Sequence, residues 1–300
     1  MLRHCLILSL LVLPATAYAD TPAPLPPAVR DMLAAAIASG NDTDIDTVAR
    51  IAKQTNPDAA PEVDALVNGY REQKNKDNEE HIRHADAFDL WKGKGEFGLL
   101  RSTGSSSEFG VSGSLTLTRQ GLHWRHVLRA HADYRRANGE TSQEHFLFAY
   151  EPRVQINDKA FTYGLVQYER DPIIGFDNRY TASAGIGYDY IRNDRMRLSL
   201  DAGPSFRHVK YTDDGIEDRA GIRSSLDFNW KLSPTLTLQQ NASAYFEKDN
   251  STLTSLTALD AKILSRLSAR FSYNAAYESK TELTAETLDT LSKVTLVYDF

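Results

Sequence analysis

Histidines that lie near acidic residues are the side chains of this sequence with the clearest chemical potential. His123 and His131 fall on one face of an extended segment, and Asp133 follows on the same face. A serine hydrolase needs a histidine and a carboxylate of this kind beside an activated serine. The sequence contains no Gly-x-Ser-x-Gly motif to mark such a serine. We therefore expect no enzymatic activity.

A second pair of histidines could bind a metal ion. His81 and His84 are three residues apart in a segment with helical character, and Glu80 or Asp86 could complete a shared site. The surrounding sequence is charged on every side, which is typical of a helix surface exposed to solvent. We favour the solvated surface and expect no metal here.

Acidic residues also crowd one short segment, at Asp213, Asp214, Glu217 and Asp218. Carboxylates are the ligands that Ca²⁺ prefers, so this segment could be a calcium loop. The dipeptide Asp214-Gly215, however, is a common hairpin turn. We favour the turn, and the sequence as a whole predicts no cofactor.

The first nineteen residues have the pattern of a targeting signal rather than of a structural element. Arg3 precedes an apolar core at Leu6–Leu13, and Ala17 and Ala19 match the small-x-small pattern before a cleavage site at Asp20. The apolar core is too short to span a bilayer as an anchor. We expect a secretory signal peptide over residues 1–19, which would remove the single cysteine and leave a mature chain without disulfides.

The overall composition is typical of a soluble protein, and the chain is mildly acidic. The chain has 34 Lys and Arg against 40 Asp and Glu, a net charge of −6, and no dense basic cluster, so we expect no nucleic-acid partner. The mean hydropathy is −0.43. A membrane β-barrel can share this average, because its apolar residues occupy alternate positions along each strand.

Residues 20–90 predict a helical region. The expected helices are Pro27–Ser39 with a stop at Gly40, Asp44–Gln54 with a cap at Asn41 or Thr43, and a third from about Ala59 to Phe88. The second half of the third helix is charged all round and could equally be a linker.

Residues 91–300 follow a period of two instead. Turn signals divide them into twelve strands, near 91–101, 108–118, 122–136, 143–155, 160–170, 179–190, 195–209, 218–231, 235–247, 252–263, 267–278 and 287–300. Such strands are long enough to cross a bilayer at a tilt and are long for a soluble sandwich. The sequence therefore predicts an all-β fold, an antiparallel transmembrane β-barrel of about twelve strands. An even count would return both ends of the barrel to the side of the periplasmic helices.

The face opposite the apolar residues is strongly charged. A midplane arginine facing lipid would cost about 2–4 kcal/mol, so these side chains must face the lumen. The predicted lumen network comprises Arg125, Arg129, Asp133, Arg195, Arg197, Asp201, Arg207, Arg219, Arg223, Asp227, Asp260 and Arg270. We favour ion pairs that fill a narrow barrel. The alternative is a polar pore, in which the excess of arginine over aspartate would favour anions.

The last strand carries a recognisable ending. Val294, Leu296, Tyr298 and Phe300 share one face, and the final residue is aromatic. This pattern resembles the signal by which the barrel-assembly machinery recognises outer-membrane barrels. We therefore expect that machinery and outer-membrane lipid as partners.

Several motifs of the strand region resemble the YdiY-like, salt-induced outer-membrane protein family, also known as domain of unknown function 481. They are Trp91–Gly98, Arg101–Gly104, Gly121–His126, Tyr163–Asp171, Gly185–Tyr188, Ala202–Pro204 and Asp289–Leu291. One position departs from the family pattern. The family has Thr-Gly-Asn here, and this chain has Ser105 in place of the Asn. The resemblance implies an outer-membrane barrel and no catalytic residues.

The combined prediction is a signal peptide at 1–19, a periplasmic helical region and linker at 20–90, and an outer-membrane barrel at 91–300. The expected role is envelope structure or passive passage of small solutes. The alternatives are a plugged barrel whose helices bind a periplasmic partner, a barrel hydrolase, and a secreted soluble β-protein.

Overall fold

The computed structural model describes residues 24–102, 107–248, 250–279 and 287–300. The predicted signal peptide with Ala17, Ala19 and Asp20 lies outside the described residues. The chain forms two compact units, one ending at His81 and the other beginning at Ile82. No helix in the described part of the chain is long and apolar enough to cross a membrane.

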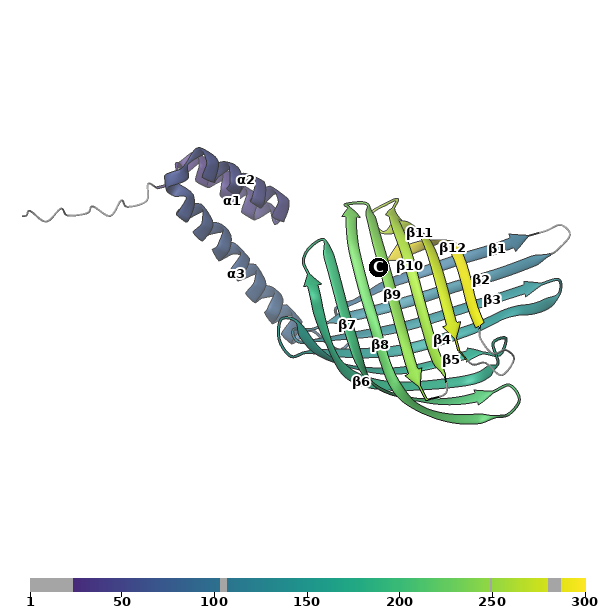
Figure 1. Ribbon diagram of the computed structural model, residues 1–300. Coiled ribbons are helices and arrows are strands. Elements are labelled where there is room, and N and C mark those ends of the chain that lie inside the picture. Colours follow the sequence, from purple (N-terminus) through teal and green to yellow (C-terminus); the bar gives the residue numbers. More distant parts are fainter. Residues whose placement is uncertain (1–23, 103–106, 249, 280–286) are drawn as a thin grey trace, which may run out of the picture. The chain divides into compact units, whose positions relative to one another are not determined.

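The first unit consists of helices, as predicted. The elements are α1 (Pro27–Ser39), α2 (Asp42–Thr55), the short 3-10 helix η1 (Pro57–Ala59) and α3 (Ala60–His84) (Figure 1). Gly40 ends α1 in the left-handed conformation, with φ of 69°, as a helix stop should. Of the two candidate caps of α2, Asn41 is the one used: its side chain accepts a hydrogen bond of 3.0 Å from the Thr43 backbone.

Apolar side chains from all three α-helices hold this unit together. Leu33, Ile45 and Val63 are almost fully buried in one cluster. The charged half of α3 remains helical to His84, so the linker alternative and the expected end at Phe88 are both wrong. Lys74 Nζ donates a hydrogen bond of 2.9 Å to Asp42 on α2, and this bond raises the pKa of Lys74 above its ordinary value.

The second unit is a closed antiparallel barrel, and its described residues form twelve strands as predicted. The strands are β1 (Trp91–Ser102), β2 (Glu108–Gln120), β3 (Trp124–Ala137), β4 (Glu140–Gln155), β5 (Ala160–Asp171), β6 (Phe176–Arg192), β7 (Met196–Tyr211), β8 (Ile216–Ser233), β9 (Leu236–Glu247), β10 (Ser251–Lys262), β11 (Leu267–Glu278) and β12 (Thr287–Asp299). Each strand pairs with its sequence neighbours, and β1 closes the barrel against β12. The predicted fold class is therefore confirmed.

Side-chain burial separates the two faces of the barrel wall. Val294, Ile186 and Phe206 point outward and are 76%, 68% and 50% exposed. Arg207, next to Phe206 along β7, is 2% exposed because it points into the lumen. The charged residues thus lie inside and the apolar residues outside, the reverse of a soluble protein.

The closing contact between β1 and β12 is much shorter than the other strand pairs. It runs only from Lys94 opposite Asp299 to Phe97 opposite Leu296, whereas β1 pairs with β2 over its whole length. Phe300 extends the closure by exchanging two backbone hydrogen bonds, of 2.8 and 2.9 Å, with Gly93. The remainder of the two strands diverges toward the end of the barrel opposite the chain terminus.

Strands β6 and β7 approach each other unusually closely at two glycines. A methyl group on Gly203 would overlap the backbone oxygen of Ala184, and one on Gly185 would overlap that of Ala202. Any larger residue at either position must therefore push the two strands apart.

Replacement of Gly203 by alanine should destabilise the barrel by about 1–3 kcal/mol, because the added methyl overpacks this contact. The temperature at which the heat-modifiable gel shift of the detergent-extracted protein is lost should fall. Gly113→Ala on β2 is the matched control, since its methyl would lie 3.8 Å from the nearest backbone oxygen. Equal midpoints for the two variants would contradict the close approach.

Candidate functional site

One cluster of charges spans the lumen between strands β3 and β8. Arg223 donates a hydrogen bond of 2.7 Å to Asp201, and Arg153 lies 3.7 Å from the same carboxylate. Arg153 also contacts Glu151 at 2.6 Å, and Arg129 contacts that glutamate at 2.5 Å. The side chains of Asp201 and Glu151 are each only 2% exposed. Two buried carboxylates are therefore shared among three guanidinium groups.

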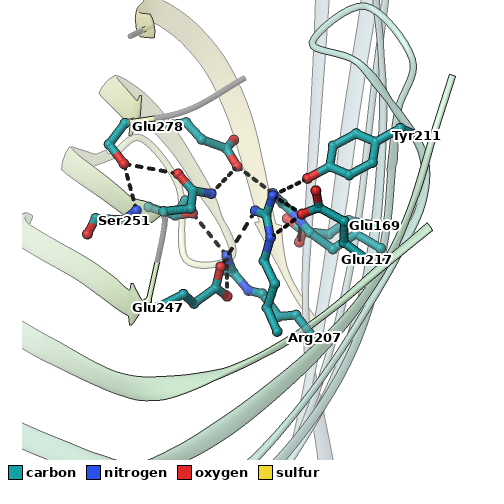
Figure 2. Close-up of polar contacts among 12 residues, drawn as sticks. Glu169, Arg207, Tyr211, Glu217, Glu247, Ser251 and Glu278 are labelled. Carbon is teal, nitrogen blue, oxygen red and sulfur yellow. Dashed lines mark hydrogen bonds and ion pairs between the residues drawn. The ribbon is translucent and has the colours of Figure 1, made fainter. Parts of the chain in front are cut away.

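A second cluster connects opposite walls of the barrel (Figure 2). Arg179 on β6 donates a hydrogen bond of 2.8 Å to Glu169 on β5 and one of 3.4 Å to Glu278 on β11. Arg207 on β7 lies 3.4 Å from Glu247 on β9, and both side chains are 2% exposed. The Arg179–Glu278 contact crosses the interior, because β6 and β11 are far apart in the strand order.

A third cluster lies next to the β1–β12 closure. Arg270 binds Asp260 at 2.6 Å and Glu96 at 2.9 Å, and Glu96 also accepts a hydrogen bond of 2.5 Å from Thr295. These contacts tie β10, β11, β1 and β12 together from the lumen side. They strengthen the closure where few backbone pairs are formed.

Aromatic rings cover several of the buried guanidinium groups. Arg207 lies 3.5 Å from the centre of the Tyr245 ring, and Arg153 lies 4.9 Å from that of Phe161. Stacking of this kind offsets part of the lost hydration of the cation. The described lumen wall is thus packed with charged and aromatic side chains over strands β4 to β9.

Most of the predicted lumen residues take part in these contacts. Ion pairs are made by Arg129, Asp133, Asp201, Arg207, Arg219, Arg223, Asp260 and Arg270. Asp227 instead accepts a hydrogen bond of 2.9 Å from Asn241. Arg125 has a buried Nε without a hydrogen-bond partner. Arg197 on β7 is exposed.

Arg195 was predicted on the lumen wall, and that prediction is wrong. It lies in the turn between β6 and β7, because β7 begins one residue later than expected. His123 is likewise in a turn and exposed, since β3 begins at Trp124. The alternation continued past the strand ends in both cases, so periodicity alone could not locate the turn.

Five glutamates and three cations of the network were not predicted from the sequence. They are Glu96, Glu151, Glu169, Glu247, Glu278, Arg153, Arg179 and Lys293. Their position at the lumen-facing parity of each strand was a signal that could have found them. With these carboxylates counted, the excess of arginine that predicted anion preference largely disappears.

Two of the candidate metal sites are not assembled. His81 and His84 are exposed on α3 and belong to no cluster of three metal-ligating groups in the described chain. In the acidic segment, the backbone of Gly215 donates a hydrogen bond of 2.9 Å to Asp213, and Asp214 has φ of 66°. The predicted hairpin turn is therefore confirmed at that position.

A cleft opens where β1 and β12 diverge. Its volume is about 230 Å³, and its wall combines the apolar Leu99 and Val294 with the charged Asp133, Arg135 and Lys293. Lys293 Nζ lies 2.7 Å from Asp133 across this cleft. The cleft therefore combines an apolar wall with one ion pair.

Residues 95–300 match the family described as protein of unknown function, DUF481. The chain belongs to this family. Uncharacterized protein YdiY of Escherichia coli (strain K12) is 24% identical to this DUF481 protein over 196 residues, which cover 65% of this chain and 77% of YdiY. The predicted family resemblance is therefore confirmed.

Solved structures with similar folds include a bacterial translocator domain and an outer membrane channel. The translocator domain of autotransporter NalP from Neisseria meningitidis is 10% identical, with a TM-score of 0.43, covering 79% of this DUF481 protein and 97% of that chain. An outer membrane channel of Pseudomonas putida F1 is 8% identical, with a TM-score of 0.44. The match covers 72% of this DUF481 protein and 100% of the channel chain.

Removal of one buried partner should destabilise the DUF481 barrel strongly. Arg223→Met would leave Asp201 without its closest cation, which costs about 3–5 kcal/mol for a buried pair. Urea unfolding in lipid vesicles measures the change. Lys210→Met is the control, because its pair with Asp214 is 42% and 90% exposed and is worth about 1 kcal/mol at most. A similar loss in both variants would contradict the structural role of the lumen pairs.

Proposed function

We propose that this protein is an integral outer-membrane barrel that is occluded at rest, with a structural role in the envelope and little solute passage. The predicted signal peptide would export the chain and leave the helices in the periplasm. Outer-membrane lipid would cover the apolar outer face, and the barrel-assembly machinery would recognise the ending at Tyr298 and Phe300, which are 47% and 57% exposed.

The observation that carries this proposal is the ion pair across the lumen. Arg179 and Glu278 join β6 to β11 at 3.4 Å, and Arg179 is simultaneously held by Glu169 on its own side. A solute larger than water or a small ion would have to break this contact. The buried Arg207–Glu247 pair beside it narrows the same region further.

Passive passage of small solutes is the second candidate. The lumen contains buried polar atoms that form no hydrogen bond, including Nε of Arg207 and Arg223 and both carboxylate oxygens of Glu247, which make only longer ion pairs. Groups of this kind are normally satisfied by water, and water molecules bound beside them would allow a small residual permeability.

The helical unit supports a third candidate, an interaction module for a periplasmic partner. It has a hydrophobic core of its own and leaves Met32 and Ile51 55% and 43% exposed. Single exposed apolar side chains are ordinary, so the separate hydrophobic core is the observation that supports this candidate. This role would not depend on conduction by the barrel.

Conductance of single barrels in planar bilayers tests the occluded state. The natural protein should conduct poorly, and Glu278→Ala should raise the conductance at least about twofold, because it removes the acceptor of the cross-lumen contact while Arg179 remains bound to Glu169. Asp214→Ala serves as the control, since that residue lies in an exposed turn. A large conductance in the natural protein would overturn the proposal.

Deletion of residues 24–81 tests whether the helical unit and the barrel have separate functions. If the helices act as a binding module, the gel shift and conductance of the barrel should remain unchanged. An increased conductance after the deletion would instead assign the helices to occlusion of the barrel. Both measurements are made on the same detergent-extracted preparation.

A further inference from the structure

Strand register brings two histidines and one aspartate together on the lumen wall. His131 and Asp133 are two residues apart on β3, so both side chains point to the same face. His145 lies directly opposite Asp133 on β4. The backbone pairing itself, rather than a chance side-chain conformation, therefore places the three groups side by side.

The distances place the three groups within reach of one ion, although His131 and Asp133 are hydrogen-bonded to each other in its absence. His131 Nε2 lies 2.6 Å from Asp133 Oδ2, and the ring centres of His131 and His145 are 5.7 Å apart. One ligand atom from each of the three residues lies within 4.8 Å of the other two. A single ion at the centre of such a triangle can reach all three with bonds of about 2.0–2.2 Å after small side-chain adjustments.

We propose that His131, Asp133 and His145 form a binding site for a divalent transition metal ion, with Zn²⁺ as the representative ion. Imidazole nitrogen suits Zn²⁺, Cu²⁺ and Ni²⁺, whereas Ca²⁺ and Mg²⁺ require sets of oxygen ligands. Three protein ligands leave a fourth position for water, as in metal sites that exchange their ligands.

Two charged residues, Glu169 and Arg179, lie next to the proposed ligand His145. Glu169 lies 4.0 Å from His145 Nε2, and Arg179 holds Glu169 with a bond of 2.8 Å. At 4.0 Å the two groups are not hydrogen-bonded, but a small movement of the ring on metal binding would let Glu169 accept a hydrogen bond from it, which orients a metal-bound imidazole and increases its basicity. His145 thus connects the metal site to the ion pairs that occlude the lumen.

Lys293 is the competitor for this site. Its ammonium group lies 2.7 and 2.8 Å from the two oxygens of Asp133, where it neutralises the carboxylate. A metal ion would take over that role, and Lys293 would move into the cleft between β1 and β12, whose wall it shares with Asp133. Metal binding and the Lys293–Asp133 ion pair are therefore mutually exclusive.

Titration calorimetry with ZnCl₂ on the full-length, tag-free protein in detergent tests the site. The natural protein should bind one ion per chain at this position. His131→Gln and His145→Gln should each weaken binding by about 100-fold or more, because even partners outside the ligand set are worth about 10–100-fold. Both variants must keep the heat-modifiable gel shift, which shows that the barrel is folded.

Further variants test the role of Lys293 and distinguish this site from the histidines elsewhere in the chain. Lys293→Met should tighten Zn²⁺ binding about tenfold, which corresponds to the loss of one competing contact of about 1.4 kcal/mol. His208→Gln and the double variant of His81 and His84 should leave that affinity unchanged, since these histidines lie outside the cluster. CaCl₂ should produce no binding heat at this site.

Cobalt provides a measurement of the coordination itself. Co²⁺ bound by the natural protein should show the visible absorption of a low-coordinate site, and His145→Gln should abolish it. Zn²⁺ affinity that survives loss of both His131 and His145, or no binding by either the natural protein or Lys293→Met at millimolar Zn²⁺, would overturn the proposal. Unchanged affinity in Lys293→Met would overturn the competition between lysine and metal.

Discussion

The structure depends on the cost of placing a charged side chain next to lipid. Each strand of an extended chain sends alternate side chains to opposite faces, so a barrel wall can be apolar outside and charged inside without any change in its backbone. Phe206 and Arg207 show this directly, with one side chain half exposed and its neighbour almost completely buried. Closure of the sheet is equally required, because an unpaired strand edge would leave backbone groups without partners.

Charges that are forced into a narrow lumen must then find partners there. Glu151 and Asp201 receive two guanidinium groups each, and Arg179 reaches across to the opposite wall. A buried pair gains little stability over apolar packing, but removal of one member is expensive because the other remains buried. The network therefore specifies one arrangement of the wall and also fills the route through it, which connects stability with the proposed occlusion.

The region between β1 and β12 is the one part of the described barrel where this arrangement is less complete. Backbone pairing there is short, and Arg270 with Glu96 supplements it from the lumen. Beyond that point the strands diverge, and Asp133 and Lys293 line the cleft between them. The candidate metal site begins at this cleft and reaches Glu169 in the occluding cluster through His145. A bound ion would thus change the charge at one end of a connected set of ion pairs.

Local patterns in the sequence determined the elements. Gly40 ends a helix because it adopts a left-handed conformation with little strain, and the period of two identified the strands because residues i and i+2 face the same side whatever the strand pairs with. The same parity assigned Arg207, Arg223 and Asp201 to the lumen. It could not locate turns, which is why Arg195 was misplaced.

Only the tertiary structure decided which charges meet. Arg179 and Glu278 are 99 residues apart, and His145 opposes Asp133 through a register that the β3–β4 hairpin establishes. The first contact depends on closure of the whole sheet, which no local window of sequence contains, and the second depends on the stagger of the two paired strands, which alternation along one strand does not reveal.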